Sequence, residues 1–249
     1  MAKKFAALVA SVLVGLMLVS GAIASEKAYV NGIDFGFPPF GFVDKDGKPS
    51  GFDVEAVNWI AKEMGFTVTH QPTDWDGIIP ALNASKIDFI ASGMSATAER
   101  AEIVNFTLPY YSVTQVLVSR GDEKMDLPGF LKSGRKIGVQ RGTNTFKLLT
   151  ELKAAGAKIE IVQYDSTDLA MQDLPIGRID ASGMDSSIAH EVMKGNAFKL
   201  VGTFDAAPEN YAYAVRKADK ELLETLNAGL KKLMADPYWE ELKAKWEIY

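Results

Sequence analysis

Helical and strand-like hydrophobic patterns alternate along nearly the whole chain, and this alternation constrains its fold more than any other feature. Apolar residues recur at helical spacing over 54–64, with Asp53 as the predicted cap and Gly65 as the predicted stop. The next stretch, 66–70, is typical of a strand. Further helices are predicted over 78–83, 143–156 and 217–234, and a further strand over 87–91. The pattern predicts an α/β protein.

One motif occurs twice. A basic residue followed by Ile-Asp leads into Ser-Gly-Met at 86–94 and again at 178–184. Each copy follows a helical segment and runs into a polar loop, so we expect two substructures of similar plan. Parallel α/β sheets place ligand sites at the carboxyl ends of their strands. The two copies therefore predict that 92–95 and 184–187 form opposite walls of one cleft.

The two substructures are expected to be joined by extended chain. Residues 110–120 and 211–215 are rich in β-prone side chains, and no long polar linker separates the halves. Two extended crossings are better suited to a hinge than one flexible tether.

The N-terminus predicts export. Two lysines precede an almost wholly apolar run over 5–19, and Ala-Ile-Ala at 22–24 has the form of a cleavage site. Because the run is short for a membrane span, we interpret residues 1–24 as a signal peptide. The alternative is an uncleaved anchor. Without a cysteine for lipid attachment, the exported chain is expected in a periplasm.

Composition excludes several classes of site. The chain has no cysteine and only two histidines, His70 and His190, so we expect no metal centre and no cofactor bound through thiolates. A formal net charge of −5 provides no basic field for nucleic acid.

Arg100 is a candidate anion-binding residue. Thr97 is placed to cap a helix that begins immediately after it, which puts Arg100 near the first turn. Helix N-termini favour anions, so a cation held there beside hydroxyl groups would complete an anion site. The alternative is a surface arginine paired with Glu99 or Glu102.

Two other polar positions also have a functional and a structural interpretation. Asp185 follows a small-residue turn, where it caps a helix or pairs with an ammonium group. Asn144 and Thr145 begin a predicted helix that follows Gly142. They are interpreted either as contacts for a polar ligand or as residues that only stabilise the helix end.

An aromatic, proline-rich loop follows the first predicted strand. Phe37 in this loop and Trp75 are candidates to enclose a ligand side chain, and Asp34 is a candidate to meet its polar or cationic end. The alternative is that these aromatic rings belong to the core.

The order of motifs resembles a known family. The motifs are DFGFPPF at 34–40, GFDV at 51–54, DWDGIIPAL at 74–82, KID at 86–88, SGMSATAER at 92–100, FTLPYY at 106–111, GVQRGT at 138–143 and RID at 178–180. Together they resemble the periplasmic solute-binding proteins of polar amino-acid ABC importers, extracellular solute-binding family 3.

The resemblance implies a role for each candidate. The ligand carboxylate would be bound by Arg100 and Ser95, with Gly93 as a backbone acceptor and Asn144 and Thr145 as donors. The ligand ammonium would be bound by Asp185. The side-chain pocket would consist of Asp34, Phe37 and Trp75.

It also implies the type II periplasmic-binding-protein fold, in which two α/β lobes joined by two crossing strands enclose a ligand cleft. Lobe 1 is predicted over 25–111 and 212–249, and lobe 2 over 112–211.

The expected function is capture of a polar or cationic L-amino acid by lobe closure and its delivery to an ABC permease. The protein is expected to act as a monomer and not as an enzyme. Two alternatives remain at this point. One is a lyase of the cyclohexadienyl or arogenate dehydratase type on the same scaffold, and the other is a soluble ligand sensor for a receptor.

Overall fold

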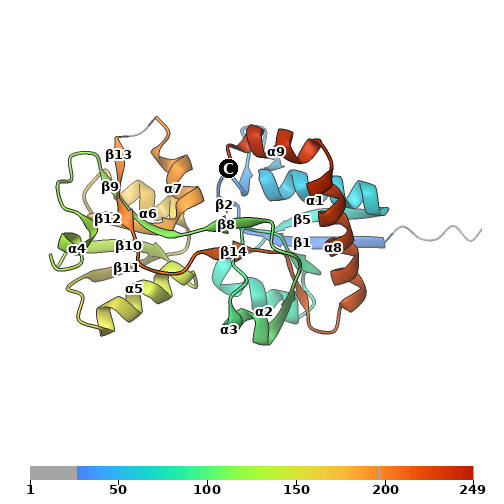
Figure 1. Cartoon of the computed structure of the whole chain (residues 1–249), viewed down its shortest axis with the longest axis horizontal. Helices are drawn as coiled ribbons and strands as arrows, with labels where there is room; N and C mark the ends of the chain where they lie inside the picture. The colour runs from blue at the N-terminus through green and yellow to red at the C-terminus, as the bar shows by residue number, and fades with distance from the viewer. Residues whose placement is uncertain (1–26, 196, 249) are drawn as a thin grey trace, which may run out of the picture.

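The computed structural model describes residues 27–195 and 197–248, so the predicted signal peptide lies outside the described residues. The chain forms two lobes side by side, each built on a five-stranded sheet (Figure 1). None of the helices in the described ranges is long and apolar enough to cross a membrane.

The first lobe contains the sheet ordered β5-β1-β6-β15-β7, a small sheet ordered β2-β3-β4, and most of the helices. Its elements before the crossing are β1 (Lys27–Ile33), β2 (Gly36–Phe37), β3 (Gly41–Val43), β4 (Pro49–Ser50), α1 (Phe52–Met64), β5 (Phe66–Pro72), the 3-10 turn η1 (Trp75–Gly77), α2 (Ile78–Asn83), β6 (Phe89–Ile90), α3 (Ala98–Ile103) and β7 (Val104–Phe106). Those after it are β15 (Ala214–Arg216), α8 (Lys220–Ala235) and α9 (Tyr238–Trp246).

The second lobe contains the sheet ordered β11-β10-β12-β9-β13. Its elements are β9 (Gln115–Arg120), α4 (Leu127–Phe130), β10 (Lys136–Gln140), α5 (Asn144–Ala154), β11 (Glu160–Tyr164), α6 (Thr167–Asp173), β12 (Ala181–Asp185), α7 (Ser186–Met193) and β13 (Phe198–Thr203).

Alternation along the strands gives each sheet two buried faces. In the first lobe, Phe89 and Val215 pack with α1, α8 and α9, whereas their neighbours Ile90 and Ala214 pack with α2. In the second lobe, Leu117 faces the cluster that contains α5, and the adjacent Val116 and Val118 face α6 and α7. Both sheets are therefore three-layer α/β units, as the alternating sequence patterns predict.

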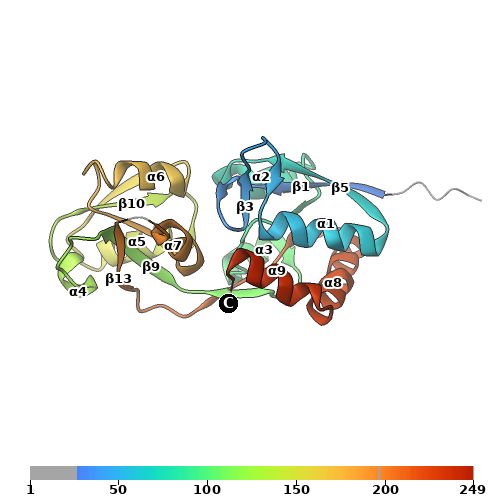
Figure 2. The same cartoon turned by 90° about the horizontal axis from the view of Figure 1, so that it is seen from above.

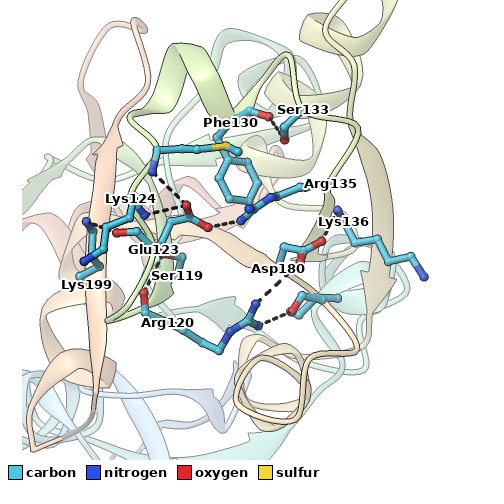
Figure 3. Close-up of polar contacts among 12 residues, drawn as sticks. Ser119, Arg120, Glu123, Lys124, Phe130, Ser133, Arg135, Lys136, Asp180 and Lys199 are labelled. Atoms are coloured by element: carbon cyan, nitrogen blue, oxygen red, sulfur yellow. Dashed lines mark hydrogen bonds and ion pairs between the residues drawn. The ribbon is translucent and has the colours of Figure 1, made fainter.

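The repeated Ile-Asp motif has the same structural role in each lobe. Asp88 accepts a hydrogen bond from the main-chain N–H of Val30 (2.8 Å) and pairs with Arg216 (3.2 Å). Asp180 accepts one from the N–H of Lys136 (2.9 Å) and pairs with Arg120 (3.7 Å; Figure 3). Each arginine also donates to two main-chain carbonyls, one of which belongs to the isoleucine that precedes its aspartate. The motif therefore ties the central strand of each sheet to its neighbours.

Two antiparallel strands join the lobes. β8 (Tyr111–Val113) and β14 (Glu209–Tyr211) run side by side between them (Figures 1 and 2), with Tyr111 opposite Tyr211 and Val113 opposite Glu209. The first predicted crossing, 110–120, contains β8, whereas the second, 211–215, shares only Tyr211 with β14 and continues into β15 of the first lobe. Of the lobe boundaries that we expect, 111/112 falls within β8 and 211/212 falls at the end of β14.

The predicted element bounds agree closely with the structure except at one cap. Gly65 ends α1 in the left-handed conformation (φ 73°), and Thr143 caps α5, both as predicted. The prediction that Asp53 caps α1 is wrong, because Gly51 occupies the cap and Asp53 lies inside the first turn. Its buried carboxylate accepts hydrogen bonds from Gly93 N (2.7 Å) and from the Tyr110 hydroxyl (2.9 Å) instead.

Candidate functional site

A pocket lies between the lobes. The carboxyl ends of β6, β10 and β12 lead into it, as the strand-end rule predicts. It is lined by residues of both lobes: Phe37, Trp75, Gly93, Ser95, Arg100, Gln140, Thr143, Asn144, Thr145, Thr167, Gly183, Met184 and Asp185. The two copies of the Ser-Gly-Met motif thus contribute to the same pocket from opposite lobes.

Arg100 lies in the first turn of α3 and lines the pocket. Thr97 Oγ1 accepts a hydrogen bond from Arg100 N (3.2 Å), which confirms the predicted cap. The guanidinium donates to the carbonyl of Ser95 (3.0 Å) and, across the cleft, to the carbonyl of Gly142 (3.2 Å). Glu99 pairs with Lys147 of the other lobe, so the alternative of a surface Arg100–Glu99 pair is not what the structure contains.

The environment of Arg100 favours an anionic ligand. Burial lowers the pKa of its guanidinium, and the nearby carboxylates of Glu209 and Asp185 oppose that effect. The guanidinium also lies over the Trp75 ring, 5.3 Å from its centroid. A half-buried cation whose hydrogen bonds go to neutral carbonyls gains from a carboxylate, which its planar fork matches.

The neighbouring wall is held by a buried network. Gly93 adopts a positive φ of 58°, and a Cβ there would lie 2.6 Å from Phe37 Cε1. Its N–H is bound by Asp53, whose pKa is raised to about 7 by burial and kept from rising further by Tyr110 and Gly93. Ser95 is buried beside it, and its main chain forms an isolated antiparallel β-bridge with Tyr211. The network fixes the main chain beside Arg100.

Asp185 stands on the opposite wall, at the carboxyl end of β12 and in the cap position of α7. Asp185 therefore occupies the predicted cap position, but its side chain forms no hydrogen bond with the N–H groups of the helix. Instead Oδ2 accepts a hydrogen bond from the Tyr211 hydroxyl (2.5 Å). Burial raises the pKa of Asp185 to about 6; the charge of Glu209 adds to this, while Tyr211, Arg100 and Gln115 oppose it.

The start of α5 contributes polar groups to the pocket. Thr143, not Asn144, caps the helix, since its Oγ1 accepts from Phe146 N (3.1 Å). Asn144 donates to Glu209 Oε2 (2.5 Å). Thr145 is 1% exposed, and its Oγ1 has no hydrogen-bond partner in the described part of the chain. A buried hydroxyl without a partner at a pocket wall is suited to a polar ligand.

The aromatic candidates have both predicted roles. The rings of Phe37 and Trp75 are nearly parallel, at 13° and 6.3 Å between centroids, and both line the pocket. Phe37 also packs on Phe40 (6.1 Å) and belongs to the core, whereas Trp75 is only half-buried and donates to the carbonyl of Gly142 (3.1 Å).

Asp34 lies beside the pocket and is not among its lining residues. Its carboxylate accepts hydrogen bonds from Gly36 N (2.8 Å) and from the pocket residue Gln140, across the cleft (2.7 Å). Burial raises the pKa of Asp34, and the charge of Asp74 adds to this. Burial raises the pKa of Asp168 as well, and the charge of Asp34 adds to this. That Asp34 meets the ligand therefore stays a prediction, and Gln140 is the pocket residue bonded to it.

Sequence reasoning missed several of these residues. Gln140 and Thr167 line the pocket from β10 and α6, and Thr167 Oγ1 lies 3.3 Å from Gln140 Oε1. The strand-end rule points to Gln140, which is the last residue of β10. No local signal identifies Asp53, Tyr110 or Tyr211 as supports, because their partners lie far away in sequence. Within residues 27–195 and 197–248, no three acidic or histidine side chains are grouped to hold a metal ion.

Comparison with known proteins identifies relatives over most of the chain. The sequence model of the bacterial extracellular solute-binding proteins, family 3, matches residues 29–248. The L-arginine-binding protein of Pseudomonas aeruginosa is 35% identical over 232 residues, which cover 90% of this chain and 89% of that protein. The L-cystine-binding protein TcyJ of Escherichia coli is 32% identical over 217 residues, covering 86% of this chain and 80% of that protein.

A solved structure agrees in fold. An ancestral arginine-binding protein bound to arginine superposes with a TM-score of 0.82 at 35% identity, covering 89% of this chain and 98% of the other. The two-lobed periplasmic-binding-protein fold, predicted from the sequence motifs, is confirmed.

Proposed function

The chain belongs to the bacterial extracellular solute-binding proteins, family 3, and on this premise we propose that it binds a free polar or cationic L-amino acid between its lobes. The lobes are assigned to 25–111 with 212–249 and to 112–211. The closed form delivers the ligand to the permease of an ABC importer, and the protein acts as a monomer in the periplasm after removal of residues 1–24.

The observation that carries the proposal is the placement of opposite charges on opposite walls of one pocket. Arg100 comes from the first lobe and Asp185 from the second, and both line the pocket. In the proposed complex, Arg100 and Ser95 bind the α-carboxylate with Thr145 and Asn144, and Asp185 binds the α-ammonium with the Gly93 carbonyl. A zwitterion is the ligand that satisfies both walls together.

The side-chain end of the pocket favours a cation. Burial and then the charge of Asp74 raise the pKa of Asp34, and burial and then the charge of Asp34 raise the pKa of Asp168. A guanidinium or ammonium group placed there relieves this repulsion, and Phe37 and Trp75 provide aromatic faces for it. We therefore rank arginine first, ahead of lysine, histidine and glutamine. The arginine-binding relatives support this ranking, and the cystine-binding relative shows that the family accommodates other side chains.

Closure couples binding to delivery. Three cross-cleft contacts are Gln140 with Asp34, Arg100 with Gly142, and Lys147 with Glu99. Only a closed arrangement brings Arg100 and Asp185 to the same molecule, so binding energy shifts the lobes toward closure. Micromolar affinity corresponds to about 8 kcal/mol, and paired charges at both ends of the ligand are a sufficient source.

We infer that the protein is not an enzyme. A dehydratase of the cyclohexadienyl type needs a proton donor directed at a ring hydroxyl, and an ammonium clamp has no part in that chemistry. Incubation with prephenate or arogenate therefore leaves both compounds unchanged, and turnover of either would overturn this inference.

The experiment that tests the proposed function is a thermal-shift screen. Protein stripped of ligand in denaturant and refolded is heated with each standard amino acid in turn. Because a ligand that binds the folded state raises the unfolding temperature, we expect the largest shift with L-arginine. A set of shifts within error of zero for all polar and cationic amino acids would contradict the proposal.

A further inference from the structure

We propose that Tyr211 is a positioning residue for amino-acid binding, whose hydroxyl holds the Asp185 carboxylate in the orientation that the ligand ammonium requires. This inference rests on the proposed function, because it assigns the ammonium to Asp185. It adds a residue in the ribbon between the lobes that touches no part of the ligand in the scheme above.

The first observation is the bond itself. The Tyr211 hydroxyl donates to Asp185 Oδ2 at 2.5 Å, and Ser187 Oγ lies 3.5 Å from the same hydroxyl. Aspartate in the cap position of a helix ordinarily turns its side chain back to the helix N–H groups. Asp185 occupies that position in α7 and makes no such bond. Tyr211 therefore takes the carboxylate in place of the helix end and leaves Oδ1 for an ammonium group.

The second observation is the rigidity of Tyr211. It is fully buried, and its ring packs edge-to-face on Phe40 (5.1 Å, 81°) with Phe37 and Tyr111 at 6.4 and 5.9 Å. Its main-chain carbonyl accepts from Tyr110 N (2.9 Å). The hydroxyl is thus fixed by the first lobe's aromatic cluster, while its acceptor belongs to the second lobe. The bond therefore connects the aromatic cluster of the first lobe to Asp185 of the second.

Charge gives the bond a second consequence. Burial and Glu209 raise the pKa of Asp185, whereas the hydrogen bond from Tyr211, the charge of Arg100 and the amide of Gln115 lower it. Removal of the hydroxyl therefore raises this pKa further. The neutral acid, which pairs poorly with an ammonium, then persists to higher pH.

The test compares two tyrosines with the same burial. Tyr213 is also fully buried and packs on Tyr110 (5.0 Å), but its hydroxyl has no hydrogen-bond partner among the residues described. Calorimetry of Tyr211→Phe and Tyr213→Phe uses L-arginine and 5-guanidinopentanoate, which has the same side chain and carboxylate but no ammonium.

Tyr211→Phe is expected to weaken L-arginine binding by about tenfold or more and to leave 5-guanidinopentanoate within about twofold. Tyr213→Phe should change neither. In Tyr211→Phe the loss of L-arginine affinity on acidification should also begin at higher pH than in the wild type. Equal losses for both ligands, or the same small effect in both variants, would overturn the inference.

Asp185→Asn separates this inference from the proposed function. If Asp185→Asn binds L-arginine as the wild type does, the proposed ammonium site is wrong. If Asp185→Asn loses affinity and Tyr211→Phe does not, only the positioning role is wrong. We expect the double variant to bind no more weakly than Asp185→Asn alone, because the hydroxyl acts through the carboxylate; additive losses would contradict this.

Discussion

The side-chain amide of Gln140 donates a hydrogen bond of 2.7 Å to Oδ2 of Asp34, which joins the end of β10 in one lobe to the loop after β1 in the other. Gln140 lines the pocket and Asp34 is 9% exposed behind it. The pair places a buried carboxylate where the ligand side chain ends in the proposed complex. A cationic side chain would share this carboxylate with Gln140.

Asp34→Asn is expected to weaken L-arginine binding about tenfold more than L-glutamine binding. The substitution removes the charge that favours a guanidinium, and a neutral amide side chain does not depend on that charge. Calorimetry with both amino acids measures the difference. Asp44→Asn is the matched control, because Asp44 also accepts from the main-chain N–H two residues on but is not a pocket residue. An equal loss for the two ligands in Asp34→Asn would refute the side-chain assignment.

L-Arginine affinity should fall as the pH drops through about 6, the pKa to which burial raises Asp185. The sign follows from the charge: a raised pKa leaves the free carboxyl protonated below about 6, and only the ionised form pairs with an ammonium. The raised pKa of Asp34 acts in the same direction. Below pH 6, binding should release a proton and the affinity should fall by up to about tenfold per pH unit. Titrations in buffers of different ionisation enthalpy count that proton, and a pH-independent affinity between about pH 8 and pH 5 would show that the carboxyl is not used.

Gly93→Ala should destabilise the protein more than Gly65→Ala. Both glycines have positive φ, 58° and 73°, so both substitutions incur about 1 kcal/mol of backbone strain. A Cβ at position 93 also meets Phe37 at 2.6 Å, whereas one at position 65 meets nothing within 4 Å. Overpacking adds about 1–3 kcal/mol at position 93 only.

Urea unfolding of the two glycine variants and the wild type gives these differences in free energy. L-Arginine binding should weaken in Gly93→Ala and stay unchanged in Gly65→Ala. Equal destabilisation of the two variants would mean that the Gly93–Phe37 packing relaxes without cost.

Local sequence patterns predicted the parts of this molecule that depend on near neighbours. The period of apolar residues located the main helices, and Thr97 and Thr143 could be identified as caps because a cap bonds a residue three positions ahead. The repeated Ile-Asp motif predicted two substructures of similar plan. In the structure, each aspartate bonds the neighbouring strand of its own lobe.

The same patterns could not predict contacts that depend on the completed fold. Asp53 has the local features of a cap, yet burial against Gly93 and Tyr110 gives it another role. Asp34 was identified as a polar group near the ligand, but its partner Gln140 comes from the other lobe. The Tyr211–Asp185 bond likewise joins a connecting strand to a lobe. In each case tertiary packing, which no short window contains, decides the partner.

The most direct test of the central claim, that Arg100 and Asp185 bind opposite ends of one amino acid, is calorimetry of refolded, ligand-free protein with three related compounds. They are L-arginine, agmatine, which lacks the carboxylate, and 5-guanidinopentanoate, which lacks the ammonium. We predict that L-arginine binds and that each analogue binds about a hundredfold more weakly or worse, since each leaves one buried charge without its partner. An analogue that bound as tightly as L-arginine would contradict the claim for the residue facing the missing group.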